Sequence, residues 1–227
     1  MSGQSALRSR REEEKLARRV SIVDAAEAVF FDKGVARTSM DDVARRARLS
    51  RALIYVYFKD KQDLHMAVVH RAAEMLLERF QRAAGAETVG MKKVRAIGGA
   101  YYRFMLECPD HFNMLTQGSS QVQEAAARAS EESPNKAALT ATREATMMFM
   151  TEVIREGLAD GSIDAGKVKD PLQTAYFLRG SLHGVMMLTR AECLADDGMT
   201  VADPDALIDY TFARMNDSIG ARGKPGG

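Results

Sequence analysis

The sequence contains no tryptophan and, among its 227 residues, only five prolines and two cysteines. Cys108 and Cys193 lie far apart and offer no metal-binding spacing, which favours a reduced protein. No apolar run approaches the ~20 residues that span a bilayer, and the N-terminus lacks the apolar centre of a signal peptide. We therefore expect a cytoplasmic protein without a membrane-spanning segment.

Signatures of catalysis are also missing. The sequence has no Gly-rich phosphate loop, no H-E-x-x-H zinc motif and no serine elbow accompanied by an ordered histidine and aspartate. His65 and His70 are five residues apart, which places them on different faces of a helix rather than together as a metal pair. We therefore expect no catalytic residue, no metal and no cofactor, and a protein that is not an enzyme.

What is present is an ordinary globular composition with an uneven distribution of charge. The chain is 46% hydrophobic and 28% charged, with a net charge of +1. Residues 1–65 hold 14 Lys and Arg against 10 Asp and Glu, hence +4, whereas the remainder holds 18 against 21, hence −3. A more basic first third is consistent with a nucleic-acid-binding end of the chain.

Apolar residues recur mostly at every third and fourth position, which is typical of amphipathic helices. In residues 16–33 the apolar stripe runs from Leu16 through Val20 and Val23 to Phe30, and Gly34 follows as a stop signal. The fold class is therefore all-α, with residues 1–10 and 220–227 expected to be disordered. The other expected helices are about 39–46, 50–58, 60–84, 91–107, 111–115, 120–131, 134 to 157–161, 170–196 and 203–219.

The run "LIYVYF", residues 53–58, conflicts with this pattern, because its residue types favour a strand. A strand there would need a partner, and no other convincing strand occurs in the chain. Ser50 and Asp60, which are typical helix-capping residues, bracket the run. We therefore expect a short helix with Ile54 and Phe58 on its buried face, since β-propensity yields readily to tertiary context.

Two short helices joined by about four residues are typical of the helix-turn-helix unit, whose second helix enters the major groove of DNA. Arg51 on that helix either forks onto a guanine edge or contacts a phosphate. Tyr55 and Tyr57 touch thymine methyls or phosphates, unless they are core aromatics of an ordinary helical domain. Lys61 and the free N–H groups at the helix starts suit phosphates. Upstream, "RSRREEEKLARR" is either a helical extension or a minor-groove arm.

Residues 20–64 resemble the DNA-binding domain of the TetR family of bacterial transcriptional regulators. The resemblance rests on "IVDAAEAVFFDKGVARTSMDDVA" followed by "LSRALIYVYFKDKQDL". It implies a three-helix DNA-binding domain (12–58), linked by helix 60–84 to a larger helical domain (59–220) that binds a ligand and dimerises.

Four positions depart from the family pattern. Arg48 stands where a glycine usually forms the turn; a positive φ there would cost about 1 kcal/mol, unless the turn differs or Arg48 gains a phosphate contact. Ala52, Leu53 and Tyr57 replace a common glycine, threonine and histidine, so a relative's operator sequence does not transfer. The residues expected to contact DNA are Ser39, Arg48, Ser50, Arg51, Ala52, Tyr55, Val56, Tyr57 and Lys61.

The rest of the chain is rich in methionine and aromatic residues, most of which must form the core. The resemblance implies that some line a pocket for a small apolar or amphipathic effector. Arg179 and His183 are polar candidates for either the pocket or a dimer interface. The candidate ligand-binding residues are Tyr101, Phe104, Met105, Phe112, Met147, Met150, Phe177 and His183.

The resemblance also implies a homodimer built from the last two long helices, about 170–196 and 203–219. Gly180 and Gly184 are four residues apart, so they would let two helices approach closely; Met187 and Tyr210 are the other candidates for this interface. The sequence thus predicts a homodimeric regulator of transcription, most simply a repressor, that binds a palindromic operator in double-stranded DNA and is released by an effector. The alternatives are an activator of the same family, a regulator controlled by a protein partner, and a helical ligand-binding or protein-interaction module without DNA binding.

Overall fold

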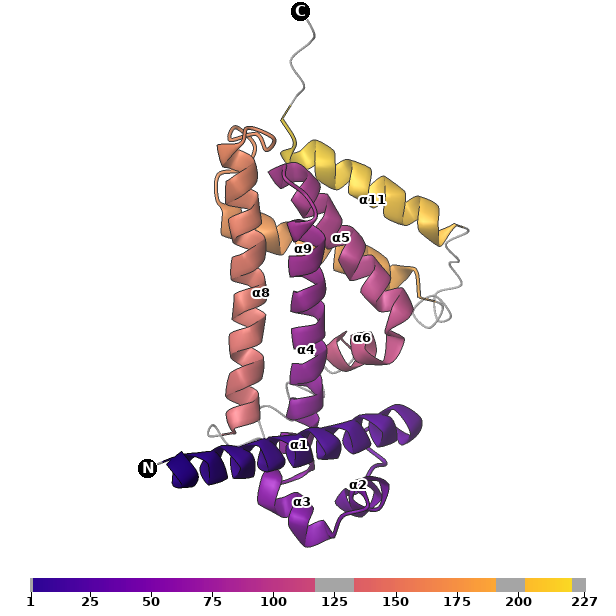
Figure 1. The fold of residues 1–227 in the computed structure, drawn as a ribbon. Coiled ribbons are helices and arrows are strands. Elements are labelled where there is room, and N and C mark those ends of the chain that lie inside the picture. The colour runs from indigo at the N-terminus through magenta and orange to yellow at the C-terminus, as the bar shows by residue number, and fades with distance from the viewer. Residues whose placement is uncertain (1, 117–132, 191–202, 222–227) are drawn as a thin grey trace, which may run out of the picture. The chain divides into compact units, whose positions relative to one another are not determined.

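The computed structural model describes residues 2–116, 133–190 and 203–221, with side chains from Arg10 onward. Within these ranges the chain forms nine helices and no strand, which confirms the all-α prediction (Figure 1). The helices are α1 (Ser2–Lys33), α2 (Met40–Ala47), α3 (Arg51–Tyr57), α4 (Lys61–Gly85), α5 (Gly90–Glu107), α6 (Pro109–Thr116), α8 (Pro134–Ala159), α9 (Pro171–Leu188) and α11 (Pro204–Ile219). The helix expected over 120–131 lies outside the described residues.

Three details differ from the sequence prediction. α1 begins at Ser2 and so extends into the segment 1–10, where disorder is expected; the exposed ion pair between Arg10 and Glu14, at 3.2 Å, supports its early turns. α9 ends at Leu188 rather than near residue 196, and the Thr189 hydroxyl donates back to the Met186 carbonyl at 2.8 Å. Leu16 and Val20 are exposed, so the buried stripe of α1 starts later than predicted.

Packing divides the chain into two compact units. The first combines Met1–Ala73 with Asp110–Ala141, and the second combines Glu74–Pro109 with Thr142–Gly227. The first part of α4 and α6 from Asp110 onward therefore pack with α1 to α3, a division that differs from a boundary at residues 58 and 59. That boundary stays a prediction.

The core of the first unit is built where α1 crosses α2 and α3 (Figure 1). Ile22 of α1, Ile54 of α3 and Leu64 of α4 are completely buried there, and Phe58 almost so. Ile54 and Phe58 thus face the core as the sequence predicts, and their burial outweighs the strand preference of "LIYVYF". Gly34 ends α1 with a φ of 77°, a left-handed conformation that glycine adopts without cost.

The second unit packs α5, α9 and α11 against one another. Gly90 at the start of α5 lies so close to Gly157 of α8 that an added Cβ would be 2.2 Å from the Gly157 Cα. Asp160 then fixes the start of α5, because its carboxylate accepts the Gly90 N–H at 2.7 Å. Asp170 and Asp203 cap α9 and α11, each followed by a proline in the first turn, as their sequences indicate.

Candidate DNA interface and ligand pocket

Reciprocal caps hold the two short helices α2 and α3 in place. The Ser39 hydroxyl accepts the Asp42 N–H at 3.2 Å, and the Asp42 carboxylate accepts the Ser39 N–H at 3.0 Å. Lys33 donates to Asp42 at 2.8 Å, and this bond together with those from Ser39 holds the pKa of the Asp42 carboxyl well below its usual range. On α3 the Ser50 hydroxyl accepts the Leu53 N–H at 3.2 Å. Ser39 and Ser50 are thus exposed capping residues at the two helix starts.

Arg48 forms the turn between the two helices in the conformation that usually favours glycine. Its φ of 56° and ψ of 39° are left-handed, and its N–H is directed to the carbonyls of Ala44 and Arg45. The turn has therefore kept its geometry without a glycine, at a cost of about 1 kcal/mol. The Arg48 side chain is exposed, at the end of α2 that adjoins α3.

The outer face of α3 presents a small, mixed surface. Arg51 and Ala52 are exposed, Tyr55 exposes 42% of its surface and Val56 exposes 71%. This exposure leaves the side chains of Tyr55 and Val56 available to a partner. Tyr57, by contrast, is half-buried and packs against the core of the first unit.

Arg51 is held in an exposed cluster that a DNA surface could reorganise. Its guanidinium donates to Asp41 of α2 at 3.1 Å and to the Tyr55 hydroxyl at 3.3 Å, and it lies 5.5 Å from the centre of the Tyr55 ring. Exposed ion pairs of this kind contribute about 0–1 kcal/mol. Arg51 can therefore exchange Asp41 for a phosphate or a base edge at little cost.

Lys61 occupies a different position from the other predicted contacts. Its ammonium donates to the carbonyls of Val35, Ala36 and Thr38, at 3.0, 3.2 and 2.9 Å. These carbonyls belong to the loop between α1 and α2, so the side chain of Lys61 braces that loop from the start of α4. No signal in the sequence identifies these partners, because they lie 23 to 26 residues away.

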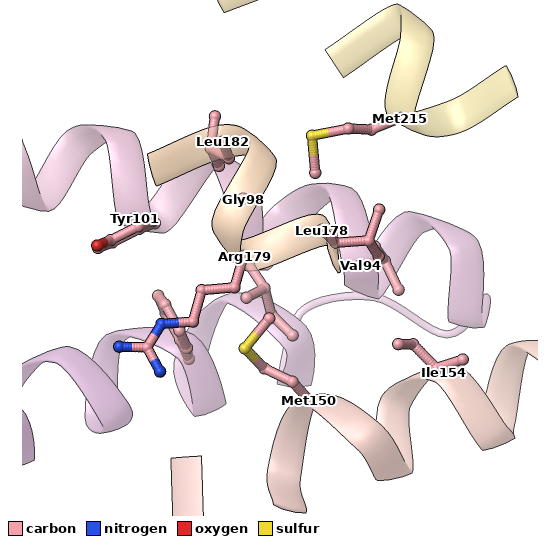
Figure 2. A pocket seen from close by; sticks show the side chains of 11 residues that line it. Val94, Gly98, Tyr101, Met150, Ile154, Leu178, Arg179, Leu182 and Met215 are labelled. Atoms are coloured by element: carbon pink, nitrogen blue, oxygen red, sulfur yellow. The ribbon is translucent and has the colours of Figure 1, made fainter. Parts of the chain in front are cut away.

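A partly open apolar pocket lies within the second unit (Figure 2). Its volume is about 30 Å³, room for only one or two water molecules. Aliphatic and aromatic side chains form most of the wall, and Arg179 supplies the one charged group. The lining residues are Phe80, Val94, Ile97, Gly98, Tyr101, Met150, Ile154, Leu178, Arg179, Leu182 and Met215.

The polar end of this pocket is formed by Tyr101, Arg179 and their neighbour His183. The Tyr101 hydroxyl and the Nδ1 atom of His183 are 2.9 Å apart. Burial raises the pKa of Tyr101 to about 12, and burial followed by the charge of Arg179 lowers the pKa of His183. Both groups are consequently neutral near pH 7, so the positive charge at this end comes from arginine.

The predicted ligand-binding residues are distributed unevenly around this pocket. Tyr101 and Met150 line it, and His183 joins it through Tyr101. Three others are buried in the second unit without lining it: Phe104, Met105 and Met147. Phe177 is exposed, and Phe112 is buried in the first unit. Sequence reasoning missed the aliphatic wall from α5, because Val94, Ile97 and Gly98 carry no signal beyond that of core residues.

α9 and α11 leave an apolar face exposed. Tyr176, Phe177 and Leu188 on α9 each expose more than half of their surface, as does Tyr210 on α11. Gly180 and Gly184 lie on the same side of α9, and an added Cβ at either would meet nothing within 4 Å. Met187, the other predicted interface residue, is half-buried.

In the part of the chain that the structure describes, no three His, Cys, Asp or Glu side chains gather as metal ligands. Likewise, none of the described helices is both long enough and apolar enough to cross a membrane.

Comparison with known proteins gives two family matches. Residues 22–68 match the model for bacterial regulatory proteins of the tetR family, and residues 94–215 match the tetracyclin repressor-like C-terminal domain. The first covers α2, α3 and parts of α1 and α4, and the second covers the elements that line the pocket after Phe80. The two matches together span most of the described residues.

Individual relatives match over different lengths of the chain. The chain is 32% identical over 88 residues to the HTH-type transcriptional activator FasR of Mycolicibacterium smegmatis. This match covers only 39% of this chain and 40% of FasR. It is 27% identical over 198 residues to the uncharacterized HTH-type transcriptional regulator Rv0472c of Mycobacterium tuberculosis, covering 86% of this chain and 74% of that protein. These names support the prediction of a regulator rather than an enzyme.

Solved structures share the fold. SmeT, described as the repressor of the Stenotrophomonas maltophilia multidrug efflux pump SmeDEF, matches with a TM-score of 0.60 and 21% identity, covering 92% of this chain and 94% of SmeT. An identity this low shows the fold alone.

Proposed function

Because the chain belongs to the TetR family of bacterial regulatory proteins, we propose that it represses transcription by binding a palindromic operator as a homodimer, in the cytoplasm. A small effector bound in the second unit weakens that binding. The observation that carries the proposal is the outer face of α3, where Arg51, Tyr55 and Val56 are exposed on a helix that Ile54 and Phe58 fix to the core.

The chemistry of this face suits a major groove. The guanidinium of Arg51 can pair with guanine O6 and N7, while Tyr55 and Val56 offer apolar contact to thymine methyl groups. Ser39, Arg48 and Ser50 surround the face with groups that suit phosphates. Lys61 supports the site indirectly, since its ammonium is engaged by the loop carbonyls.

The exposed apolar face of α9 and α11 supports the homodimer. Apolar patches of this kind on soluble proteins commonly mark interaction surfaces. A palindromic operator requires two-fold symmetry of the dimer, because its two half-sites lie about one turn of DNA, ~34–36 Å, apart and each must bind one α3 helix. Sedimentation of Phe177→Glu should show monomers, while the equally exposed Met148→Glu on α8 should leave a dimer. A dimer that persists in Phe177→Glu would place the interface elsewhere.

The apolar pocket supports an effector site. A ligand that binds one conformation of the dimer more tightly than the other shifts the operator affinity by the ratio of its affinities for the two conformations. Such a shift typically corresponds to about 1–3 kcal/mol. Met150 and Met215 are suited to open the pocket, because methionine side chains repack easily.

Selection of genomic fragments with the purified full-length protein tests the operator proposal. We expect enrichment of a shared palindrome, and loss of enrichment in Tyr55→Ala, which deletes an exposed ring without opening the core. A reporter gene placed behind the enriched site then shows whether the protein represses or activates transcription. This measurement matters because one relative is named as an activator. Absence of any enrichment at low salt would favour a ligand-binding module that does not use DNA.

A further inference from the structure

The pocket of the second unit carries positive charge that no described carboxylate balances. Arg179 of α9 lines the pocket, and its hydrogen bond there is to the Met147 sulfur at 3.3 Å, which is a weak acceptor. Arg143 of α8 does not line the pocket and its side chain is exposed overall; partial burial of its guanidinium, and then the charge of Arg179, lower its pKa, so the two cations interact. Among the described residues, neither arginine has an acidic partner.

This lack of partners is not general in the second unit. Arg79 donates to Glu107 at 2.6 Å, and Arg155 donates to Glu152 at 3.1 Å. Arg214 pairs with Asp217 at 2.7 Å. Arg179 is distinguished from these three arginines by its place in the pocket wall as well as by its lack of an acidic partner among the described residues.

Arg179 is half-buried in the wall of an apolar cavity and is repelled by the charge of Arg143. An anion beside the Arg179 guanidinium would offset both penalties. Guanidinium groups bind carboxylates through two parallel hydrogen bonds, which fixes the orientation of the anion as well as attracting it. The Tyr101 hydroxyl ends on the same side of the pocket as the Arg179 guanidinium (Figure 2). The polar groups therefore converge on one end.

The opposite end is apolar throughout. Val94, Ile154 and Met215 lie away from the Arg179 guanidinium, with Leu178 between (Figure 2). Because the cavity holds only about 30 Å³, a ligand must enter by displacing flexible side chains, of which Met150 and Met215 are the most adaptable. A slender apolar group meets this requirement better than a bulky polar one.

We propose that the effector is an amphipathic monoanion, an apolar chain that ends in a carboxylate, with the carboxylate bound by Arg179 and further attracted by the charge of Arg143. The apolar chain occupies the space between α5, α8 and α9. This assignment rests on the proposed function, because it names the ligand class of the same effector pocket. It extends that function, because the pocket would then select its effector by the charge of the ligand as well as by its shape.

Calorimetric titration of the full-length protein with decanoate and with 1-decanol tests the assignment, since the two probes share a ten-carbon chain and differ in the charge of the head. We expect decanoate to bind at least about tenfold more tightly, the value of one charge-assisted hydrogen bond. In Arg179→Leu this preference should fall to about twofold or less, while decanol affinity is retained. Arg179→Lys, which keeps the charge, should retain part of the preference.

The matched control is Arg155→Leu, which removes a paired, exposed arginine from the same helix as Arg143. It should leave the preference for decanoate unchanged. Equal binding of decanoate and decanol by the wild-type protein would overturn the anionic ligand class while leaving the effector pocket intact. Binding of neither probe would overturn both, and operator affinity measured on the same sample would show separately whether DNA binding stands. A preference that survives in both Arg179→Leu and Arg143→Leu would overturn the role of the arginines.

Discussion

Arg71 in the first unit and Arg179 in the second have contrasting surroundings. Arg71 of α4 donates to Asp24 and Glu27 of α1, at 2.6 and 3.3 Å. Arg179 has a methionine sulfur as its hydrogen-bond acceptor. The charge of Arg71 thus joins α4 to α1, whereas the charge of Arg179 at the pocket is available to a group from outside the chain. The contrast suggests that the first unit is preformed for its partner and that the second is completed by one.

Lys61→Met should produce the largest loss of stability, because it removes the ammonium that binds three carbonyls of the α1–α2 loop. Charge-assisted hydrogen bonds in partly buried sites support a loss of about 3 kcal/mol in the free energy of unfolding, measured by urea denaturation. Lys59→Met, at an exposed neighbouring position, is the control and should change stability far less. Equal effects of the two substitutions would show that the loop does not depend on Lys61.

His65 should make the first unit sensitive to acid. Burial, and to a smaller extent Lys61, lowers the pKa of His65 to about 4 from an ordinary value of 6.5. The unfolded chain therefore binds a proton more readily than the folded one, and stability falls as pH decreases between these values. The loss from pH 7 to pH 5 is about 2 kcal/mol. His65→Gln should flatten the pH dependence of the melting temperature in this range, and an unchanged slope would contradict the assignment.

The substitutions Arg71→Leu and Arg179→Leu test the contrast between the two arginines directly. Removing Arg71 leaves Asp24 without its cation and Glu27 with His111 alone, at 3.3 Å, and should cost about 1 kcal/mol. Removing Arg179 relieves repulsion with Arg143 and should leave the melting temperature unchanged or slightly higher when no anion is bound. Urea denaturation of both variants measures these changes in stability. A similar loss in the free energy of unfolding of both variants would mean that Arg179 also completes the packing of its unit.

The smallest expected effect is at Arg48. Arg48→Gly should relieve the left-handed strain of the turn, offset partly by the entropy of glycine in the unfolded chain, for a net gain of about 0.5 kcal/mol. Arg46→Gly, inside α2, should instead destabilise the protein. If Arg48 contacts a phosphate, Arg48→Gly will bind DNA more weakly although it is more stable, a combination that thermal melting and DNA titration can separate.

Local patterns predicted most of the backbone. The caps at Ser39, Ser50 and Asp170 and the stop at Gly34 act over three or four residues, so their sequence signals are sufficient. At Arg48, where the sequence left an altered turn open, the residue keeps the left-handed conformation without a glycine. These elements depend on chemistry between near neighbours in the chain.

Long-range partners could not be predicted in this way. Asp63 is buried, and its carboxylate accepts hydrogen bonds from Ser133 and Asn135, 70 and 72 residues away, at 2.6 and 2.7 Å. Nothing in the spacing of these residues indicates that they meet. For the same reason the exposed position of Phe177 and the location of Phe112 in the first unit became visible only in the structure.

The central claim is that the exposed face of α3 binds operator DNA. Its most direct test is the affinity of wild type and Arg51→Ala for the selected operator over a series of salt concentrations, with Arg155→Ala as a control for lost charge. The account predicts affinity that falls steeply with salt in the wild type, is about 1–3 kcal/mol weaker in Arg51→Ala and is unchanged in Arg155→Ala. Equal operator affinity of all three proteins at every salt concentration would contradict it.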